Sequence, residues 1–252
     1  MINLLKQYGK VALSLAGILA VWWGVVLSGV ISEDFFPSPY SVITAAKELY
    51  DDGILISDLN VSMGRAAIGF AIGVCLGVSI GLLTARTIFF SYALGPFLTL
   101  LRPIPAIALV PIAIVWFGIG EGSKYFVISY TVFLAVWLNT HHGTIHVAET
   151  YIRAARSLGA GRFREFFEVI IPAAAPHIFV GIRLGAALAF LSLVAAELSG
   201  SSAGIGFRLQ DARDYIRTDR MFVGLIELGI LGALLDQFIV FVGNKIVHWE
   251  QL

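Results

Sequence analysis

Arg102 is the residue whose position most clearly suggests chemistry, because it lies inside an apolar run and is followed closely by Pro103 and Pro105. Each interior proline removes a backbone donor and clashes with the preceding helical turn. A cation at membrane depth is costly unless it is paired or hydrated, and a broken helix there must be covered by protein or line a wet cavity. The pattern therefore predicts a solute pathway at Arg102, Pro103 and Pro105. The alternative is that Arg102 pairs with an acidic residue or lies closer to the membrane surface.

Other charged residues also lie within or near apolar runs, and they are Arg65, Arg183, Glu197, Glu227 and Asp236. The arrangement of lowest cost is mutual pairing in the interior of a helix bundle, so we expect most of them to be structural. Arg183 and Glu197 are separated by roughly 21 Å along a helix. We therefore expect these two not to pair with each other.

Patterns for catalysis and metal binding are missing from the sequence. His142 and His146 have a spacing that can hold a metal, but there is no H-E-x-x-H motif, so we expect them and His141 to position the neighbouring loop. The chain has no G-x-S-x-G motif and no G-x-x-x-x-G-K-[ST] phosphate loop. We expect no catalytic residue, no metal site, no cofactor bound by this chain, and no ATP hydrolysis by it alone.

The elements that must position these residues are long apolar helices. Of the 252 residues, 58% are hydrophobic and only 13% are charged, against roughly 25% charged in soluble domains. The net charge of zero gives no reason to expect nucleic acid as a partner. Apolar runs near 11–31, 62–85, 92–117, 124–142, 173–197 and 221–247 predict an all-α membrane protein of about six transmembrane helices, forming one domain over 1–252. We expect the first run to be a retained helix and not a cleaved signal.

The charges between these runs predict an orientation. With an even number of spans both termini share one side, which would hold the basic residues Lys6, Lys10, Arg86, Arg153, Arg156, Arg162, Arg164 and Lys245. The positive-inside bias then places both termini in the cytoplasm. Four arginines between 208 and 220 fall on the other side, where interleaved aspartates could pair with them.

Two further patterns predict helix packing. Ser38 and Pro39 have the order of an N-cap and first residue for a short helix in the first outer loop, which we expect to be a packed connector. Gly69, Gly73, Gly77 and Gly81 recur on one face of the second span, so that another helix can approach closely. We favour packing within the chain over a subunit interface.

The loop at 147–171 predicts two short helices joined by a turn. Glu149 and Arg153 can pair at i,i+4, and Gly159 stands where a helix end needs positive φ. Phe163, Phe166 and Phe167 supply apolar area that is unfavourable in water unless a partner covers it. The pattern indicates a helix–turn–helix projection that a partner protein binds.

This loop resembles the "EAA" loop of binding-protein-dependent permeases. The resemblance rests on Ala154, Ala155, Gly159, Val169, Ile171 and Pro172. Arg153 departs from the family, which usually has glutamate at that position. Further segments resemble the sulfonate, taurine and nitrate permeases, most closely those for aliphatic sulfonates: 36–39, 62–65, 102–105, 116–121, 196–197 and 204–206.

The resemblance implies a type I ATP-binding-cassette importer permease in a bacterial plasma (inner) membrane. The 147–171 segment would form the cytoplasmic coupling helix, with Arg153, Ala154, Ala155, Gly159, Arg162, Phe163 and Pro172 at the ATPase contact. It further implies two ATPase subunits that hold the ATP and Mg, a second permease copy, and an extracytoplasmic binding protein. The cargo would be an aliphatic sulfonate, with taurine, nitrate, bicarbonate or a pyrimidine precursor as alternatives.

Two other classes of function stay open on the residues alone. A membrane-embedded enzyme would need convergent acids, histidines or a nucleophile at membrane depth, and the sequence offers only scattered charges. An ion-driven secondary carrier is disfavoured because no internal repeat is visible.

Overall fold

The computed structural model describes the backbone of residues 2–249, and its side chains from residue 13 onward except for Leu15. Helices make up nearly all of this described part, and no strand occurs in it. The elements are α1 (Ile2–Leu27), α2 (Pro39–Asp51), α3 (Ile54–Arg86), α4 (Ile88–Leu101), α5 (Ala106–Phe117), α6 (Glu121–Ile145), α7 (Glu149–Ser157), α8 (Arg162–Arg164), the π-helix η1 (Glu165–Ile170), α9 (Ile171–Glu197), α10 (Ile205–Asp214) and α11 (Thr218–Ile246). The all-α prediction is confirmed.

The predicted spans correspond to helices, but the number of six stays a prediction. Among the described residues, three segments are long and apolar enough to cross a bilayer, namely Ile54–Arg86, Arg162–Glu197 and Thr218–Ile246. The run at 92–117 is broken, as its prolines predict: α4 and α5 meet at 108°, and together they would make a fourth span if they act as one. The run at 11–31 lies on α1, whose side chains are described only in part.

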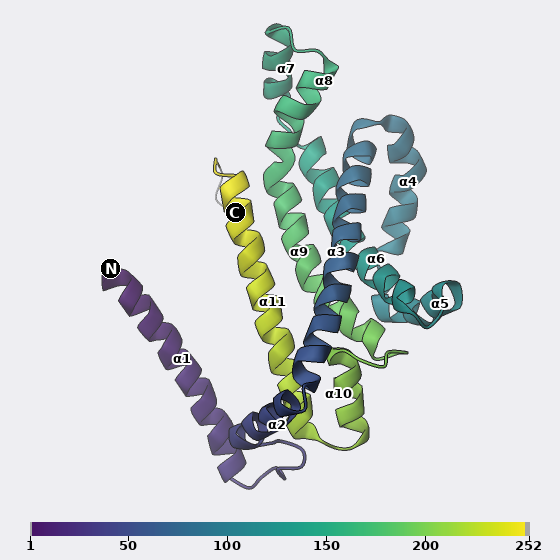
Figure 1. Ribbon diagram of the computed structural model, residues 1–252. Helices are drawn as coiled ribbons and strands as arrows, with labels where there is room; N and C mark the ends of the chain where they lie inside the picture. Colours follow the sequence, from purple (N-terminus) through teal and green to yellow (C-terminus); the bar gives the residue numbers. More distant parts are fainter. Residues whose placement is uncertain (1, 250–252) are drawn as a thin grey trace.

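The core is a three-helix packing of α3, α6 and α9 (Figure 1). The four glycines at positions 69, 73, 77 and 81 face Ile128, Val132, Val136 and Thr140 of α6. A Cβ atom on Gly73 would lie 2.6 Å from the Cβ of Val132, so only glycine allows this approach. The expectation of packing within the chain is confirmed.

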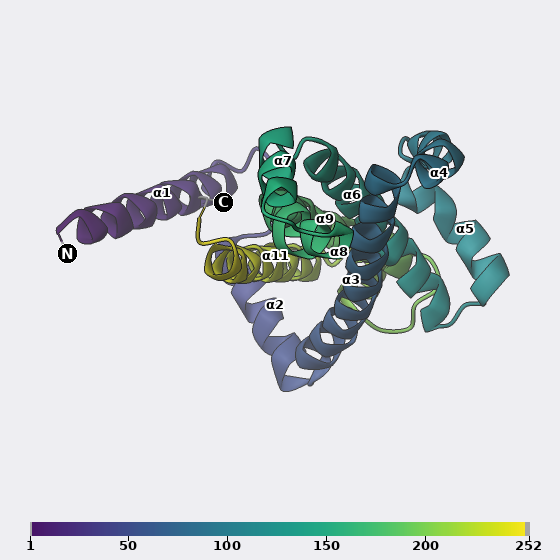
Figure 2. The ribbon, with the colours of Figure 1, turned by 90° about the horizontal axis from the view of Figure 1, so that it is seen from above.

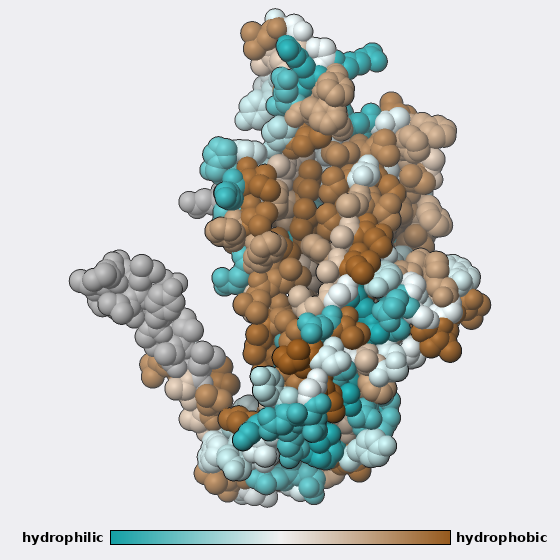
Figure 3. Space-filling model, in the orientation of Figure 1, coloured by the Kyte–Doolittle hydropathy of each residue, from teal (hydrophilic) through white to brown (hydrophobic). Residues whose placement is uncertain are grey.

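The short helices occupy the two ends of the bundle. Figure 1 shows α7 and α8 at one end, and α2 and α10 at the opposite end. Figure 2 shows α1 extending away from the other helices. In Figure 3 the side of the bundle between the two ends is mainly hydrophobic, whereas hydrophilic residues gather at both ends, which is the distribution expected of a chain embedded in lipid.

The connector α2 ties α1 to the bundle. The Ser38 hydroxyl accepts a hydrogen bond from the Ser41 amide at 3.2 Å, which confirms the predicted N-cap. Val42 and Leu49 are buried beside Val223 of α11. Ile43 and Tyr50 are exposed, whereas Ala45 is buried in the same cluster as Val42 and Leu49.

Candidate functional site

The loop at 147–171, called the coupling loop below, folds as two helical segments that reverse direction at Gly159. Gly159 has φ +82°, and its amide donates to the Arg156 carbonyl at 3.0 Å while the Ala160 amide donates to Ala155 at 3.0 Å. These bonds satisfy carbonyls at the end of α7. The chain then continues through α8 and η1 directly into α9, where Pro172 is the second residue. The predicted turn and its positive φ are confirmed.

Glu165 is the internal anchor of the coupling loop. Its side chain is only 5% exposed, and its carboxylate accepts from Arg156 Nε at 2.7 Å and from Arg86 Nη2 at 3.2 Å. Arg156 belongs to α7 and Arg86 to the last turn of α3, so one carboxylate joins the loop to the core. The hydrogen bond from Arg156, with the positive charge of both arginines, holds the pKa of Glu165 below its usual range.

The outer surface of the coupling loop carries exposed apolar side chains among its charged ones. Leu158 is 89% exposed and Phe163 is 75% exposed. Ala154, Gly159 and Arg162 also lie on the exposed surface, and Ala155 is half-buried. Arg153 pairs with Glu149 at 2.8 Å on the solvent side, so it makes no ion pair with the bundle among the described residues. The geometry can present a small apolar knob to a partner.

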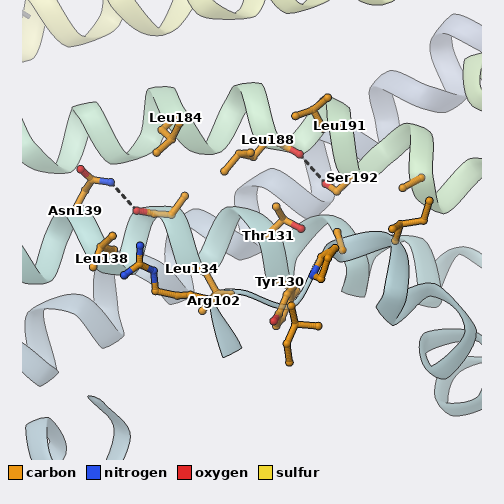
Figure 4. Close-up of a pocket in the computed structure, with 16 residues that line it drawn as sticks. Arg102, Tyr130, Thr131, Leu134, Leu138, Asn139, Leu184, Leu188, Leu191 and Ser192 are labelled. Atoms are coloured by element: carbon orange, nitrogen blue, oxygen red, sulfur yellow. Dashed lines mark hydrogen bonds between the residues drawn. The ribbon is translucent and has the colours of Figure 1, made fainter. Parts of the chain in front are cut away.

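A second feature is a cavity of about 570 Å³ beside the break between α4 and α5. Arg102 and Pro105 line it together with residues of α6 and α9 (Figure 4). Pro103 is exposed and does not line it. Arg102 is the one charged side chain among the lining residues that the structure describes. The alternative of an acidic partner for Arg102 gains no support there, because Glu197 and Asp236 pair with other arginines.

A third feature is a buried ion network at the end of the bundle opposite the coupling loop. Arg65 makes two 2.7 Å hydrogen bonds to Glu121 and one of 2.8 Å to Glu197. Glu197 is 1% exposed and also accepts from Ser62 at 2.8 Å and from the Gly206 amide at 2.7 Å. The network therefore joins α3, α6 and α9 through charged groups whose hydrogen bonds compensate for their burial.

The face of α3 that carries Arg65 also binds the segment at 204–205, which leads into α10. Asp58 accepts from the Gly204 amide at 2.8 Å and from Arg208 Nε at 2.9 Å. Ser62 accepts from the Ile205 amide at 2.8 Å. The sequence predicts Arg65 and Glu197 as intramembrane charges, but their contacts with Ser62 and Gly206, and those of Asp58 with Gly204, were not predicted. The i, i+4, i+7 spacing of Asp58, Ser62 and Arg65 on one helix face was the available signal.

The remaining intramembrane pair joins Arg183 to Asp236, with oxygen contacts of 2.6 and 2.9 Å. Mutual pairing is thus confirmed for Arg65, Glu197, Arg183 and Asp236, and Arg183 does not pair with Glu197. The expectation of pairing is wrong for Glu227, whose buried Oε1 has no hydrogen-bond partner among the described residues. The expected interior position is wrong for the pair of Arg183 and Asp236, whose side chains are 50% and 44% exposed, because α9 and α11 meet at the outside of the bundle. Among the outer arginines, three pair with interleaved aspartates as predicted: Arg208 with Asp211, Arg213 with Asp214 and Arg217 with Asp219. Arg220 pairs instead with Glu48 of α2.

The histidine cluster has a structural position. His141 Nδ1 lies 3.0 Å from the Thr84 hydroxyl, which also accepts from the Trp137 indole at 3.1 Å. Within the described part of the chain, no group of three or more His, Cys, Asp or Glu residues could hold a metal ion.

An all-helical apolar bundle with a projecting helix–turn–helix loop defines a membrane-embedded transport subunit. Residues 73–248 match the family model of the binding-protein-dependent transport system inner membrane component. The chain belongs to this family, the permeases of ATP-binding-cassette importers, and is a multi-pass membrane protein without an enzymatic role of its own.

Three relatives are similar over nearly their full length. The aliphatic sulfonates transport permease protein SsuC of Bacillus subtilis (strain 168) is 38% identical, over 97% of this chain and 90% of that protein. The taurine transport system permease protein TauC of Escherichia coli (strain K12) is 33% identical over 94% and 88%. The nitrate import permease protein NrtB of Synechocystis sp. is 35% identical over 93% and 88%.

Solved structures show the same fold. An inward-facing structure of the MetNI methionine ABC transporter matches with a TM-score of 0.59 and 18% identity, over 77% of this chain and 95% of that one. An amino acid ABC transporter crystallised with histidines matches with a TM-score of 0.57 and 17% identity, over 81% and 98%. At these identities the likeness concerns the fold alone.

Proposed function

We propose that this chain is the permease subunit of an importer that carries a small oxyanion, an aliphatic sulfonate, across the bacterial plasma membrane. Two copies form the pathway, an extracytoplasmic binding protein delivers the solute, and two ATPase subunits hold the ATP and Mg. Taurine, nitrate, bicarbonate and a pyrimidine precursor are the alternative cargoes.

The observation that carries the proposal is the construction of the coupling loop. A loop that merely connects two spans has no need of a buried carboxylate that ties it to another helix, and exposed Leu158 and Phe163 would be unfavourable in water. Both features suit a rigid projection that fits into a groove of a partner. Movement of that partner would reach α3 through Glu165 and Arg86, and α9 through the continuous helix.

The charge distribution supports an orientation with the coupling loop and both termini in the cytoplasm. The end of the bundle with the coupling loop carries several exposed arginines, among them Arg153 and Arg162. Arginines also lie at the opposite end, and both ends hold ion pairs, so the position of the coupling loop decides the proposed orientation. The binding protein would then meet the end formed by α2 and α10.

The test is to purify the chain after co-expression with the ATPase and binding protein of neighbouring genes, and to measure alkanesulfonate uptake in proteoliposomes. A soluble ATPase should co-purify, and Gly159→Trp should lower both uptake and substrate-stimulated ATP hydrolysis. Arg102→Ala should lower uptake. Normal coupling in the Gly159→Trp protein would contradict the docking role of the loop, and unimpaired transport in the Arg102→Ala protein would remove Arg102 from the pathway.

A further inference from the structure

The cavity beside Arg102 is lined by many apolar side chains and a few polar ones. Most of its lining is apolar, with leucines from α6 and α9 that include Leu134, Leu138, Leu184 and Leu188. Its volume of about 570 Å³ lies in the range of small-molecule sites. Figure 4 shows the Arg102 side chain beside α6 at one edge of this cavity, with the leucines of α9 on the other side of α6 in this view.

The polar groups of the wall have already used hydrogen-bond donors within the protein. These donors and their acceptor carbonyls are Tyr130 to Leu101 (2.7 Å), Thr131 to Val127 (3.0 Å), Asn139 to Ala135 (2.9 Å) and Ser192 to Leu188 (2.9 Å). The hydroxyl groups therefore turn lone pairs, not protons, towards a solute. The Asn139 amide keeps its second N–H, and Arg102 supplies the charged donors, whose planar guanidinium matches two oxygens of an oxyanion.

Among its described residues, the cavity lining has no negative charge that could bind a cationic group. None of the lining residues that the structure describes is an aspartate or glutamate. A charged ammonium that entered would lose hydration without gaining an opposite charge, which is unfavourable. A bare inorganic anion would in turn leave the leucine walls without an apolar partner.

We infer that this cavity is a transit site, within the permease itself, for a monoanion that carries a short alkyl chain, with Arg102 binding the anionic head and the leucines contacting the chain. The inference rests on the proposed function and deepens it, because the permease then discriminates among cargoes in addition to the binding protein. An alkanesulfonate fits the site, whereas taurine, with its ammonium group, and nitrate, with no chain, fit poorly. A single cationic contact makes binding weak, as release to the cytoplasm requires.

The test measures binding to the full chain in nanodiscs without the binding protein, by saturation-transfer NMR with propanesulfonate, taurine and nitrate-competition samples. Propanesulfonate should bind more tightly than taurine, and nitrate should displace it poorly. Arg102→Ala should weaken propanesulfonate binding about tenfold, since a hydrogen-bonded charge contributes at least that factor. Arg102→Lys should retain part of the binding.

A variant that gains taurine binding distinguishes a change of specificity from a loss of folding. Leu184→Glu places a carboxylate on an exposed position of the wall and should shift the preference towards taurine, whereas Leu225→Glu, on exposed α11 outside the cavity, should not. Equal binding of taurine and propanesulfonate by the unmodified chain would overturn the inference. Propanesulfonate binding that is unchanged by Arg102→Ala would also overturn it. Failure of an ATPase to co-purify would instead contradict the proposed function, because the NMR measurement needs no ATPase.

Discussion

Arg156 on α7 and Glu165 on η1 are joined by a 2.7 Å hydrogen bond that closes the coupling loop on itself. The same carboxylate accepts from Arg86, which lies 79 residues away at the end of α3. The loop is thus held at a fixed angle to the core by one side chain. A push on α7 would be transmitted to the bundle through this contact and through the unbroken path from α8 to α9.

Glu165→Gln should weaken the transmission of movement from the coupling loop to the helix bundle. The amide keeps the shape but loses the charge that attracts both arginines, so the loop should become less rigid relative to α3. We expect a lower ratio of solute imported to ATP hydrolysed in proteoliposomes, with the permease still folded. Glu168→Gln is the matched control, because Glu168 is exposed and its contact with Arg164 is 3.8 Å. An equal ratio of solute imported to ATP hydrolysed in the two variants would show that Glu165 does not link the coupling loop to α3.

The pH dependence of this anchor has a definite sign. The folded-state pKa of Glu165 is depressed, so its contribution to stability is present above the unfolded pKa, ordinarily about 4.3, and is lost as pH falls through the lower folded value. The difference in melting temperature between the unmodified chain and Glu165→Gln should therefore stay constant from about pH 8 to pH 5 and shrink in stronger acid. A difference that vanished near pH 7 would show that the carboxylate is not held ionised by the arginines.

Gly73→Ala should destabilise the core of the bundle. The new Cβ would lie 2.6 Å from the Cβ of Val132 and 2.8 Å from the Ser129 carbonyl, so α3 and α6 would have to separate. Overpacking of this kind costs about 1–3 kcal/mol. Gly64→Ala, on the same helix with no atom within 4 Å of its new Cβ, should be tolerated. Thermal unfolding of both proteins in detergent makes the comparison. A similar loss of stability in each would contradict the close contact of α3 and α6 at Gly73.

Glu197→Ala should destabilise the end opposite the coupling loop. It leaves Arg65 with Glu121 and the Ala203 carbonyl, and it removes the acceptor of Ser62 and of the Gly206 amide. Breaking a buried pair from one side costs roughly 3–5 kcal/mol. Hydrogen exchange should rise at residues 203–206, while the coupling loop should be unchanged. Protection of 203–206 as strong as in the unmodified chain would show that the network does not hold this segment.

Local patterns in the sequence predicted much of the fold. The glycine repeat on α3, the Ser38 cap and the positive φ of Gly159 follow from short-range sterics, and all three are present. The break at Arg102 to Pro105 also follows from proline chemistry. Its angle of 108° does not, because the packing of α5 on α6 and α9 sets that angle.

The contacts that distinguish the candidate sites are long-range, and the sequence did not predict them. Glu165 reads as an ordinary acid on a short helix, and only the approach of Arg86 makes it a buried anchor. Asp58 reads as a loop charge, yet it binds the Gly204 amide 146 residues away. Such pairs depend on which helices meet, and hydrophobic periodicity does not specify that.

The most direct test of the account is whether the exposed apolar surface of the coupling loop holds an ATPase. Leu158→Asp and Phe163→Asp alter side chains that are 89% and 75% exposed, so neither should change the thermal unfolding of the chain. We expect co-purification of the ATPase with the tagged permease to be lost in both, while Tyr40→Asp, an exposed change on α2 at the opposite end, leaves it intact. Undiminished ATPase co-purification with both coupling-loop variants would show that this surface does not bind the ATPase.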